Sequence, residues 1–381
     1  MTALAKPFAT PLAKPLAKPL AKPLATPRAT PRAADEAAPL RAVAPACPWD
    51  AALARFADAG LEQSALWGRL RWGGRDAPGI SLADGRDTVA IGRIVAARLP
   101  LFGGGLAYAK FGPAWRRRDT PPDPARYAEA IDALVAEACG RRGMMLTVQP
   151  RPHPDWQGVE HAILVEHGFV ARRERPHAER YLVAVGLDEE TRRAGLGRHW
   201  RRNLVRAERE RIVVTQETTP AGIAAFRALH AEMVARKNAS AADRVDLLPA
   251  LCAETAGPFR PRLFLARDPA GTPLAGAVVC TRGDVASYVY GASSARGLEL
   301  RAGYAVQWAV LAALAARGGS TWYDLGGTAG EEGLHRFKAG LVGDTGRILP
   351  MALEMDRWQA PRARLSGDLV HEIVRRRAGR S

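Results

Sequence analysis

The sequence predicts an α/β (α+β) protein with mixed sheets, built as two successive blocks. Segments with the two-residue period of strands alternate with longer segments in which apolar residues recur at the helical period. In each block several strand patterns precede one long helix pattern, at 124–139 in the first block and 302–317 in the second. A further strand, a turn and a shorter helix follow each time. The repeated order is compatible with two related domains in tandem.

The first block is expected at residues 46–183. Its long helix carries Tyr127, Ile131 and Leu134 on one face, and Gly168 is expected to end a second helix. The predicted elements are a helix at 51–59, strands at 88–99 and 106–111, the long helix at 124–139, a strand at 144–149, a helix at 159–167 and a strand at 180–185.

The second block is expected at residues 184–350. It opens with a helical stretch at 188–211 that Gly195 and Gly197 interrupt. The other predicted elements are strands at 212–216, 262–266, 275–281, 286–290 and 321–323, and helices at 220–236, 247–256 and 302–317. The remaining segment, 351–381, is expected to pack back on the first domain and to contain a basic helix at 368–377.

Residues 1–45 are predicted to be a disordered tail. Within 4–31 a four-residue repeat of the type Leu-Ala-Lys-Pro places proline at every fourth position. Proline at this frequency excludes helix and sheet pairing and favours an extended polyproline-like chain. It also excludes the apolar core of a secretory signal, so a cytoplasmic location is expected. An inert tail and a tail that contacts anionic lipid or RNA both remain open.

The composition favours anionic partners. The formal net charge is +16, from 55 Lys plus Arg against 39 Asp plus Glu, which suits nucleic acid, phosphorylated small molecules or an anionic membrane face. A general preference for arginine is the alternative explanation. No run of 18 apolar residues is present, so no membrane span is predicted. The four cysteines are widely separated and the eight histidines form no HExxH motif, so no metal site is inferred.

The lysines are unusually few. Only seven occur, and four of them lie in the N-terminal repeat, which leaves Lys110, Lys237 and Lys338 for the folded part. Because arginine replaces lysine almost everywhere else, these positions are candidates for sites that need a compact ammonium group. Lys338 follows a strand-like 321–323, Asp324 and a Gly-rich turn. This geometry brings backbone N–H groups and a carboxylate to one edge of a sheet.

The same region resembles a known family. Tyr323-Asp-Leu-Gly-Gly followed by Gly333-Leu-x-x-Phe-Lys-x-Gly is similar to the C-terminal signature of the FemAB/FemX aminoacyltransferases of peptidoglycan bridges. That resemblance implies two GNAT-like (acetyltransferase-like) domains around a cleft. It extends over about residues 60–350, through Gln63-Ser-x-x-Trp-Gly, Tyr108-x-x-x-Gly-Pro, His199-Trp-Arg-Arg-Asn-Leu-x-Arg, Tyr288-Val-Tyr-Gly-Ala-Ser and Gly303-Tyr-x-x-Gln-Trp.

Two residues are candidates for catalysis. The resemblance implies that Lys338 takes part in substrate binding and catalysis, and a fixed ammonium can stabilise an oxyanion or hold a phosphate. An exposed helix lysine is the alternative. Asp324 could orient the incoming amine or act as a weak base, or it could instead cap the following turn.

Further residues are candidates for binding a phosphorylated or sugar-bearing substrate. Arg71 takes the place of a lysine that, in the family, holds phosphates of the peptidoglycan precursor, and arginine can do so bidentately. The tyrosines could offer hydroxyls or could be ordinary buried tyrosines. The basic pair that ends the helix at 220–236 could contact phosphate or only complement the helix dipole. The full set is Arg71, Tyr108, Arg236, Lys237, Tyr290 and Tyr304.

Two features bear on the donor. The helical stretch at 188–211 would place four arginines on one face, as a stripe for tRNA or a diphosphate or simply as a solvated surface. These are Arg198, Arg202, Arg206 and Arg209. Arg192-x-x-Gly-x-Gly197, in contrast, fits the turn with which GNAT enzymes hold the coenzyme A pyrophosphate.

The sequence therefore predicts an N-acyltransferase that transfers an aminoacyl or acyl group to an amine of a peptidoglycan precursor or another envelope substrate. The donor would be aminoacyl-tRNA or acyl-CoA, with no tightly bound cofactor and no metal, and peripheral contact with an anionic membrane is possible. Two alternatives stay open. One is an acyl-CoA-dependent acyltransferase of envelope polysaccharide synthesis, and the other is a non-catalytic nucleic-acid- or lipid-binding protein on a GNAT scaffold.

Overall fold

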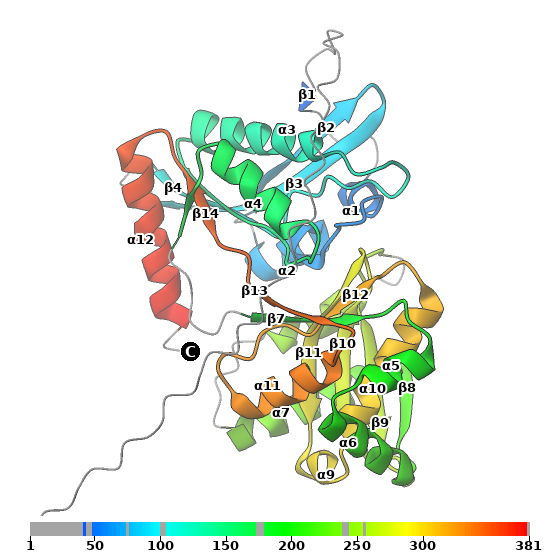
Figure 1. Ribbon diagram of the computed structural model, residues 1–381. Coiled ribbons are helices and arrows are strands. Elements are labelled where there is room, and N and C mark those ends of the chain that lie inside the picture. The colour runs from blue at the N-terminus through cyan, green and yellow to red at the C-terminus, as the bar shows by residue number, and fades with distance from the viewer. Residues whose placement is uncertain are drawn as a thin grey trace, which may run out of the picture. The chain divides into compact units, whose positions relative to one another are not determined.

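Two mixed sheets with helices on both faces make up the structure, a computed structural model (Figure 1). It describes residues 41–42, 48–73, 76–99, 104–172, 179–237, 244–253 and 257–378, and the tetrad repeat lies outside them. The predicted α/β class with two mixed sheets is confirmed.

The first half contains a sheet of strand order β1-β2-β3-β4-β5-β14-β6. Its strands are β1 (Arg41–Ala42), β2 (Asp76–Asp84), β3 (Asp87–Leu99), β4 (Gly104–Lys110), β5 (Met145–Gln149), β6 (Val170–Ala171) and β14 (Met355–Arg357). Its helices are α1 (Trp49–Leu53), α2 (Ala65–Trp72), α3 (Pro124–Val135) with a π-helical extension at Ala136–Arg141, α4 (Gln157–Glu166) and α12 (Pro361–Ala378).

The second half contains a sheet of strand order β13-β7-β12-β11-β10-β9-β8. The strands are β7 (Glu179–Ala184), β8 (Val213–Glu217), β9 (Arg262–Arg267), β10 (Pro273–Cys280), β11 (Val285–Ser293), β12 (Trp322–Asp324) and β13 (Arg347–Pro350). The helices are α5 (Glu189–Gly195), α6 (Arg198–Arg209), α7 (Pro220–Lys237), α8 (Leu248–Ala253), α9 (Ala295–Glu299), α10 (Ala302–Arg317) and α11 (Glu332–Val342).

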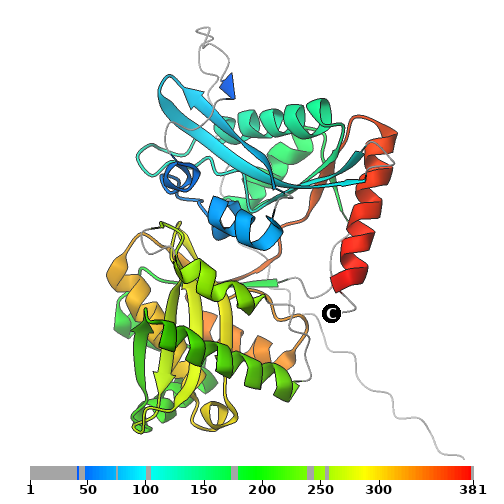
Figure 2. The same ribbon diagram turned by 180° about the vertical axis from the view of Figure 1, so that it is seen from behind.

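Strand alternation explains how helices cover both faces of each sheet. Ala107 packs in the cluster under α3, whereas its neighbour Leu106 points to the other face and meets Val370 of α12. In the second sheet Ala277 faces α10, and Val278 faces Phe226 of α7. Figure 2 shows α12 at the outer edge of the first half, far along the sheet from α1.

Each sheet contains one parallel pair at an equivalent place. β4 runs parallel to β5, and β11 runs parallel to β12, which are the pairs joined by the long helices α3 and α10. An antiparallel strand then lies beside the second member of each pair. In the first sheet this neighbour is β14, and in the second it is β7.

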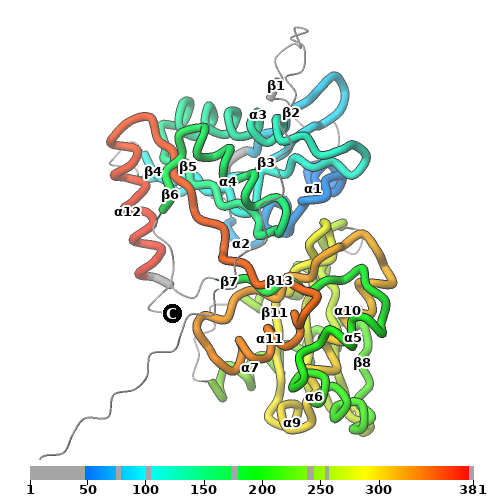
Figure 3. The backbone as a smooth tube through the Cα atoms, viewed as in Figure 1, coloured from blue at the N-terminus to red at the C-terminus, as the bar shows by residue number. Residues whose placement is uncertain are grey.

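The chain therefore crosses between the halves twice (Figure 3). The strand that sequence analysis placed at the end of the first block, β7, pairs with β12 and β13 in the second sheet. β7 therefore belongs to the second sheet, and its predicted place in the first block is wrong. β14 and α12 supply the first sheet from the C-terminal end of the chain, where α12 packs on β4 and β5. A strand's own sequence carries no information about which of two equivalent edges it will join.

β2 was not predicted from the sequence. Pro78 and Gly79 interrupt its pattern, and the pairing of β2 with β3 shifts register between Ala77 and Ile80. Proline and glycine weaken a strand signal because proline donates no ladder hydrogen bond and glycine packs no side chain.

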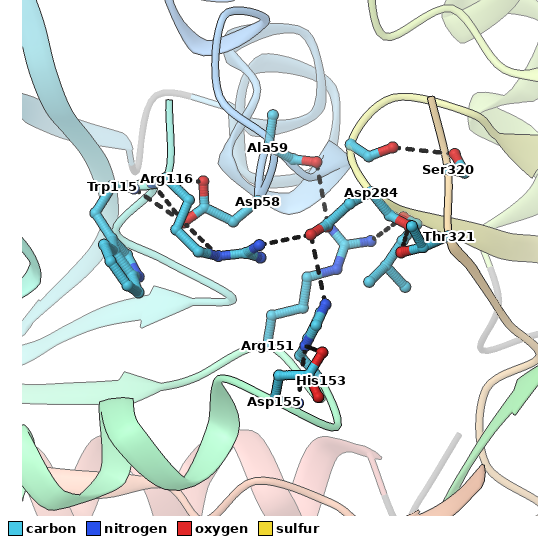
Figure 4. A network of polar contacts seen from close by, with 12 residues as sticks. Asp58, Ala59, Trp115, Arg116, Arg151, His153, Asp155, Asp284, Ser320 and Thr321 are labelled. Atoms are coloured by element: carbon cyan, nitrogen blue, oxygen red, sulfur yellow. Dashed lines mark hydrogen bonds and ion pairs between the residues drawn. The ribbon is translucent and has the colours of Figure 1, made fainter. Parts of the chain in front are cut away.

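A buried polar network joins the two halves (Figure 4). Arg116 donates to Asp284 at 2.6 Å, and His153 Nε2 lies 3.4 Å from the same carboxylate. Arg151 donates to the carbonyl of Val285 at 2.8 Å and to Ser287 Oγ at 2.7 Å. Asp284 immediately precedes β11 and Val285 begins it, so these bonds position the strand beside which β12 runs.

Candidate functional site

The turn after β12 is clamped by a lysine from α11. Lys338 is 5% exposed, and its Nζ donates to the carbonyls of Leu325 and Gly327, both at 2.6 Å. Burial lowers the pKa of Lys338 from 10.5 to about 8, and the nearby Arg180 guanidinium lowers it further, against the carboxylates of Asp324 and Glu331. An ammonium has three donors, so two bonds to the turn leave one more for a substrate.

Asp324 is buried and ion-paired at the end of β12. Its carboxylate receives Arg180 Nε at 3.1 Å and a second guanidinium nitrogen at 2.5 Å, and Oδ1 also accepts from the Gly326 N–H at 2.8 Å. The contacts therefore show Asp324 holding Arg180 and the turn in place.

Gly326 leaves space between the two cations. It has φ +75°, in the left-handed region, and a Cβ at this position would lie 3.7 Å from Lys338 Nζ and 4.0 Å from a terminal nitrogen of Arg180. The turn therefore places an ammonium and a guanidinium within 4.0 Å of a position without a side chain. Such a place suits a developing negative charge or a phosphate oxygen.

Aromatic packing aims Lys338 at the turn. Phe337 lies against Tyr304 of α10, with ring centroids 4.9 Å apart, and against Trp200 of α6 at 6.1 Å. Trp200 is buried and also packs on Gly340, where a Cβ would come within 3.1 Å of it. The two residues of the Phe-Lys pair therefore have different roles. Phe337 packs α11 against α6 and α10, and Lys338 binds the turn that follows β12.

A cavity of about 630 Å³, here called the central cavity, lies in front of this turn. Arg180 and Gly327 form part of its wall, so it meets the turn that Lys338 clamps. The rest of the lining comes mainly from α2, β3, β4 and α12, and is rich in aromatic and basic side chains. These include Trp67, Arg71, Trp72, Arg93, Tyr108, Lys110, Glu354 and His371.

The Gln63-Ser64 motif holds one side of the central cavity. Gln63 is buried, and its amide nitrogen donates to the carbonyl of Lys110 at 2.9 Å while its oxygen accepts from the Arg93 N–H at 2.7 Å. One side chain therefore bridges β3 and β4. Ser64 Oγ caps α2 by accepting from the Trp67 N–H at 3.1 Å. The motif thus fixes α2 against the sheet, with Trp67 and Arg71 facing the cavity.

Two of the predicted substrate-binding residues line the central cavity. Arg71 stands on α2, and Tyr108 on β4 donates to Gln149 at 2.8 Å and to Glu354 at 3.2 Å. Lys110, one of the three lysines outside the repeat, lines it as well. Phosphate-compatible cations therefore converge there from α2, β3, β4 and β7.

The other predicted substrate-binding residues have different surroundings. The Tyr290 hydroxyl donates to the carbonyl of Arg244 at 3.1 Å, with its ring among the side chains of α7 and α8. Tyr304 belongs to the aromatic packing of α11. Arg236 donates to the carbonyl of Ser293 at 2.8 Å, and Lys237 forms an exposed ion pair with Glu331, N-terminal to α11, at 2.9 Å. None of these four contributes to the lining of the central cavity.

The arginine stripe forms a separate basic surface. Arg198, Arg202, Arg206 and Arg209 line a shallow hollow of about 500 Å³ on α6, together with Arg201 and Val205. The opposite face of the helix, with Trp200 and Leu204, is in the core. The stripe predicted from the helical period is therefore present on one exposed face.

The Arg192–Gly197 turn is occupied by packing. Arg192 is buried and donates to the carbonyl of Leu311 at 3.0 Å. The Gly197 N–H donates to the carbonyl of Gly340 at 2.9 Å, and a Cβ on Gly195 would lie 2.8 Å from Thr345. The glycines allow α5 and α6 to approach α11 closely, and the Gly197 N–H is not directed at a ligand. Most of the segment belongs to α5, and Gly197 is the N-cap of α6.

Sequence reasoning missed Arg180, Glu354 and His371. Arg180 is 144 positions from its partner Asp324, and nothing in the local pattern of β7 distinguishes it from the many other arginines. Glu354 and His371 reach the central cavity only because the C-terminal segment returns to the first sheet. Among the described residues no group of three His, Cys, Asp or Glu side chains could hold a metal ion. Within the same residues, no helix has the length and apolar character needed to cross a membrane.

Comparison with known proteins assigns the fold. Residues 185–339 match the acetyltransferase (GNAT) domain family, and the mixed sheet of the second half agrees with that match. Over most of its length the chain is similar in structure to FemX, with a TM-score of 0.67 and 15% identity over 82% of this chain and 95% of that one. The predicted resemblance to the FemAB/FemX family is thereby confirmed at the level of the fold.

Two other solved structures show the same arrangement. The C-terminal domain of a putative lysylphosphatidylglycerol synthetase from Agrobacterium fabrum has a TM-score of 0.51 and 14% identity, over 83% of this chain and 95% of that one. A conserved protein of unknown function from Bacteroides thetaiotaomicron has a TM-score of 0.53 and 14% identity, over 84% and 98%. Comparison with curated protein sequences finds no match.

Proposed function

We propose that this GNAT acyltransferase is an aminoacyltransferase of the FemAB type. It would transfer an aminoacyl group from aminoacyl-tRNA to an amine of a phosphorylated cell-wall precursor held in the central cavity. The observation that carries the proposal is the contact of this basic and aromatic cavity with the turn clamped by Lys338. Arg180 takes part in both, because it lines the cavity and pairs with Asp324.

The residues divide the work as follows. Arg71, Lys110 and Arg180 attract the phosphates, and the aromatic side chains of α2 cover the apolar parts of the acceptor. The acceptor nitrogen attacks the ester carbonyl of the donor, a C–N bond forms, and the ester C–O bond breaks. The nitrogen loses a proton and the leaving hydroxyl of the tRNA gains one. Lys338 donates its remaining N–H to the oxyanion that develops on the carbonyl oxygen.

The donor preference rests on two surfaces. The exposed arginines of α6 can neutralise several phosphates of an RNA backbone, whereas the Arg192–Gly197 turn is used for helix packing. Acyl-CoA is the alternative donor, and a non-catalytic binding protein is the alternative class. A cytoplasmic site of action belongs to the proposal as well, because both the donor and the precursor would be made there.

The test is to incubate the purified chain with peptidoglycan precursor and either aminoacylated tRNA or acetyl-CoA. The mass of the precursor is then measured by mass spectrometry. A gain of one aminoacyl residue that ribonuclease abolishes is expected. Acetylation in ribonuclease-treated mixtures would instead establish the CoA-dependent alternative. RNA binding without any product from either donor would favour the non-catalytic class.

A second measurement addresses the α6 arginines. Replacing Arg202 and Arg206 together by glutamine should weaken tRNA binding and flatten the dependence of log affinity on log salt by about two units. The exposed Arg227 of α7, replaced by glutamine, is the matched control. An unchanged salt slope in the double variant would remove α6 from the donor site.

A further inference from the structure

The C-terminal helix α12 carries an exposed apolar stripe. Leu365, Leu369 and Ile373 recur at every fourth residue, and their exposed fractions are 71%, 42% and 37%. This spacing places the three side chains in one row on the helix surface. Ala363, Ser366 and Val370, on the neighbouring face of the helix, are buried, and α12 packs on β4 and β5. Figures 1 and 2 show no described element on the outer side of α12.

Charged residues border the stripe. On a helical projection Arg362 and Arg376 lie on the same side as the stripe, one near each end. Asp368 and Glu372 lie between the stripe and the more distant Arg364 and Arg375. Asp368 and Glu372 are the acidic residues of this part of the helix, so four arginines stand against two carboxylates. Arg375 and Arg376 share Glu372, and Arg364 lies 3.8 Å from Asp368. The outer surface of α12 is therefore both apolar and positively charged.

We propose that α12 docks the protein on an anionic phospholipid surface. A helix that lies flat in the interface inserts a row of aliphatic side chains and sets arginines among the headgroups. The net charge of +16 attracts the chain to the same surface. A second copy of the chain fits less well, because a stable protein interface needs 20 to 30 residues a side and the stripe has one row of three.

The docking has a consequence for the site. Val370, His371 and Val374 of the same helix line the central cavity. A helix with its side chains is roughly 10 Å across, so docking would bring the cavity within one helix diameter of the bilayer. If the proposed transferase function holds, an acceptor anchored in that bilayer could then enter the cavity directly. The docking itself does not depend on the transferase activity.

The test is sedimentation of the full chain with vesicles of phosphatidylglycerol, or of phosphatidylcholine alone, at low and at high salt. We expect binding to the anionic vesicles, with a part that survives high salt because insertion of apolar side chains is not screened. The triple variant Leu365→Glu, Leu369→Glu, Ile373→Glu should lose at least tenfold in affinity and lose all salt-resistant binding. Val165→Glu, at a 52% exposed position on α4, is the matched control.

Circular dichroism and thermal unfolding show whether the triple variant keeps its fold, as the exposure of the three positions leads us to expect. Equal vesicle binding by the wild type and a folded triple variant would overturn the proposal. So would binding that high salt abolishes completely in the wild type. Light scattering that finds a dimer in the wild type and a monomer in the triple variant would assign the stripe to a second copy instead.

Discussion

Replacing Lys338 should separate catalysis from stability. Its two hydrogen bonds to the Leu325 and Gly327 carbonyls, 2.6 Å each, are of the charged kind that contributes about 1.5–3 kcal/mol apiece. Burial of the ammonium offsets much of this, because a pKa lowered from 10.5 to about 8 corresponds to roughly 3 kcal/mol against the charged form. The net contribution to the free energy of unfolding is therefore small, about 0–3 kcal/mol.

Turnover should respond much more strongly. Lys338→Met keeps an unbranched apolar stem of similar size and removes the donor, so a loss of about 10²-fold or more in kcat is expected. Lys338→Arg keeps the charge but places a wide planar fork where a compact ammonium fits between two carbonyls, and it should lose nearly as much. Arg336→Met, on the exposed side of the same helix, is the matched control.

The pH dependence gives an independent readout. Because the protonated amine is the donor and its pKa is about 8, kcat of the wild type should fall as pH rises above about 8. The same lowered pKa makes the folded state bind fewer protons than the unfolded state between about 8 and 10.5, so this group adds stability as pH rises through that window. Near-normal kcat and an unchanged pH profile in Lys338→Arg would refute the donor role.

Three further perturbations test the rest of the site and its support. Gly326→Ala puts a methyl group between Lys338 and Arg180 at a φ of +75°, so we expect about 1 kcal/mol lower stability but a kcat loss of at least tenfold; equal kcat would mean that no reacting group uses this space. Asp284→Asn leaves a buried guanidinium poorly paired and should lower the free energy of unfolding by about 3–5 kcal/mol in urea titrations, whereas a change below 1 kcal/mol would show that the network does not hold the halves together. Burial raises the pKa of Glu160 from 4.5 to about 8, so ionisation opposes folding and wild-type stability should fall as pH rises from about 5 to 8. Glu160→Gln should remove about 3–4 kcal/mol of that fall, and parallel stability curves for the two proteins would contradict the assignment.

Local sequence determined the elements and the core faces. The apolar period of 124–139 and 302–317 encodes α3 and α10, because a helix buries the residues that recur at its own period. Alternation along 88–99 and 275–281 likewise encodes β3 and β10. The rarity of lysine and the Phe337-Lys338 pair directed attention to α11 from the sequence alone. In the structure Lys338 binds the turn beside the central cavity.

Tertiary structure alone decided which distant groups meet. Arg180 pairs with Asp324 because β7 joins the second sheet beside β12, and both equivalent sheet edges would accept an antiparallel strand. Glu354 and His371 reach the central cavity because β14 and α12 return to the first sheet. Tyr290 and Tyr304 are indistinguishable from Tyr108 in their local sequence, yet packing turns only Tyr108 toward the cavity. Hydrophobic periodicity records whether a residue is buried, whereas its partner depends on contacts between segments far apart in the chain.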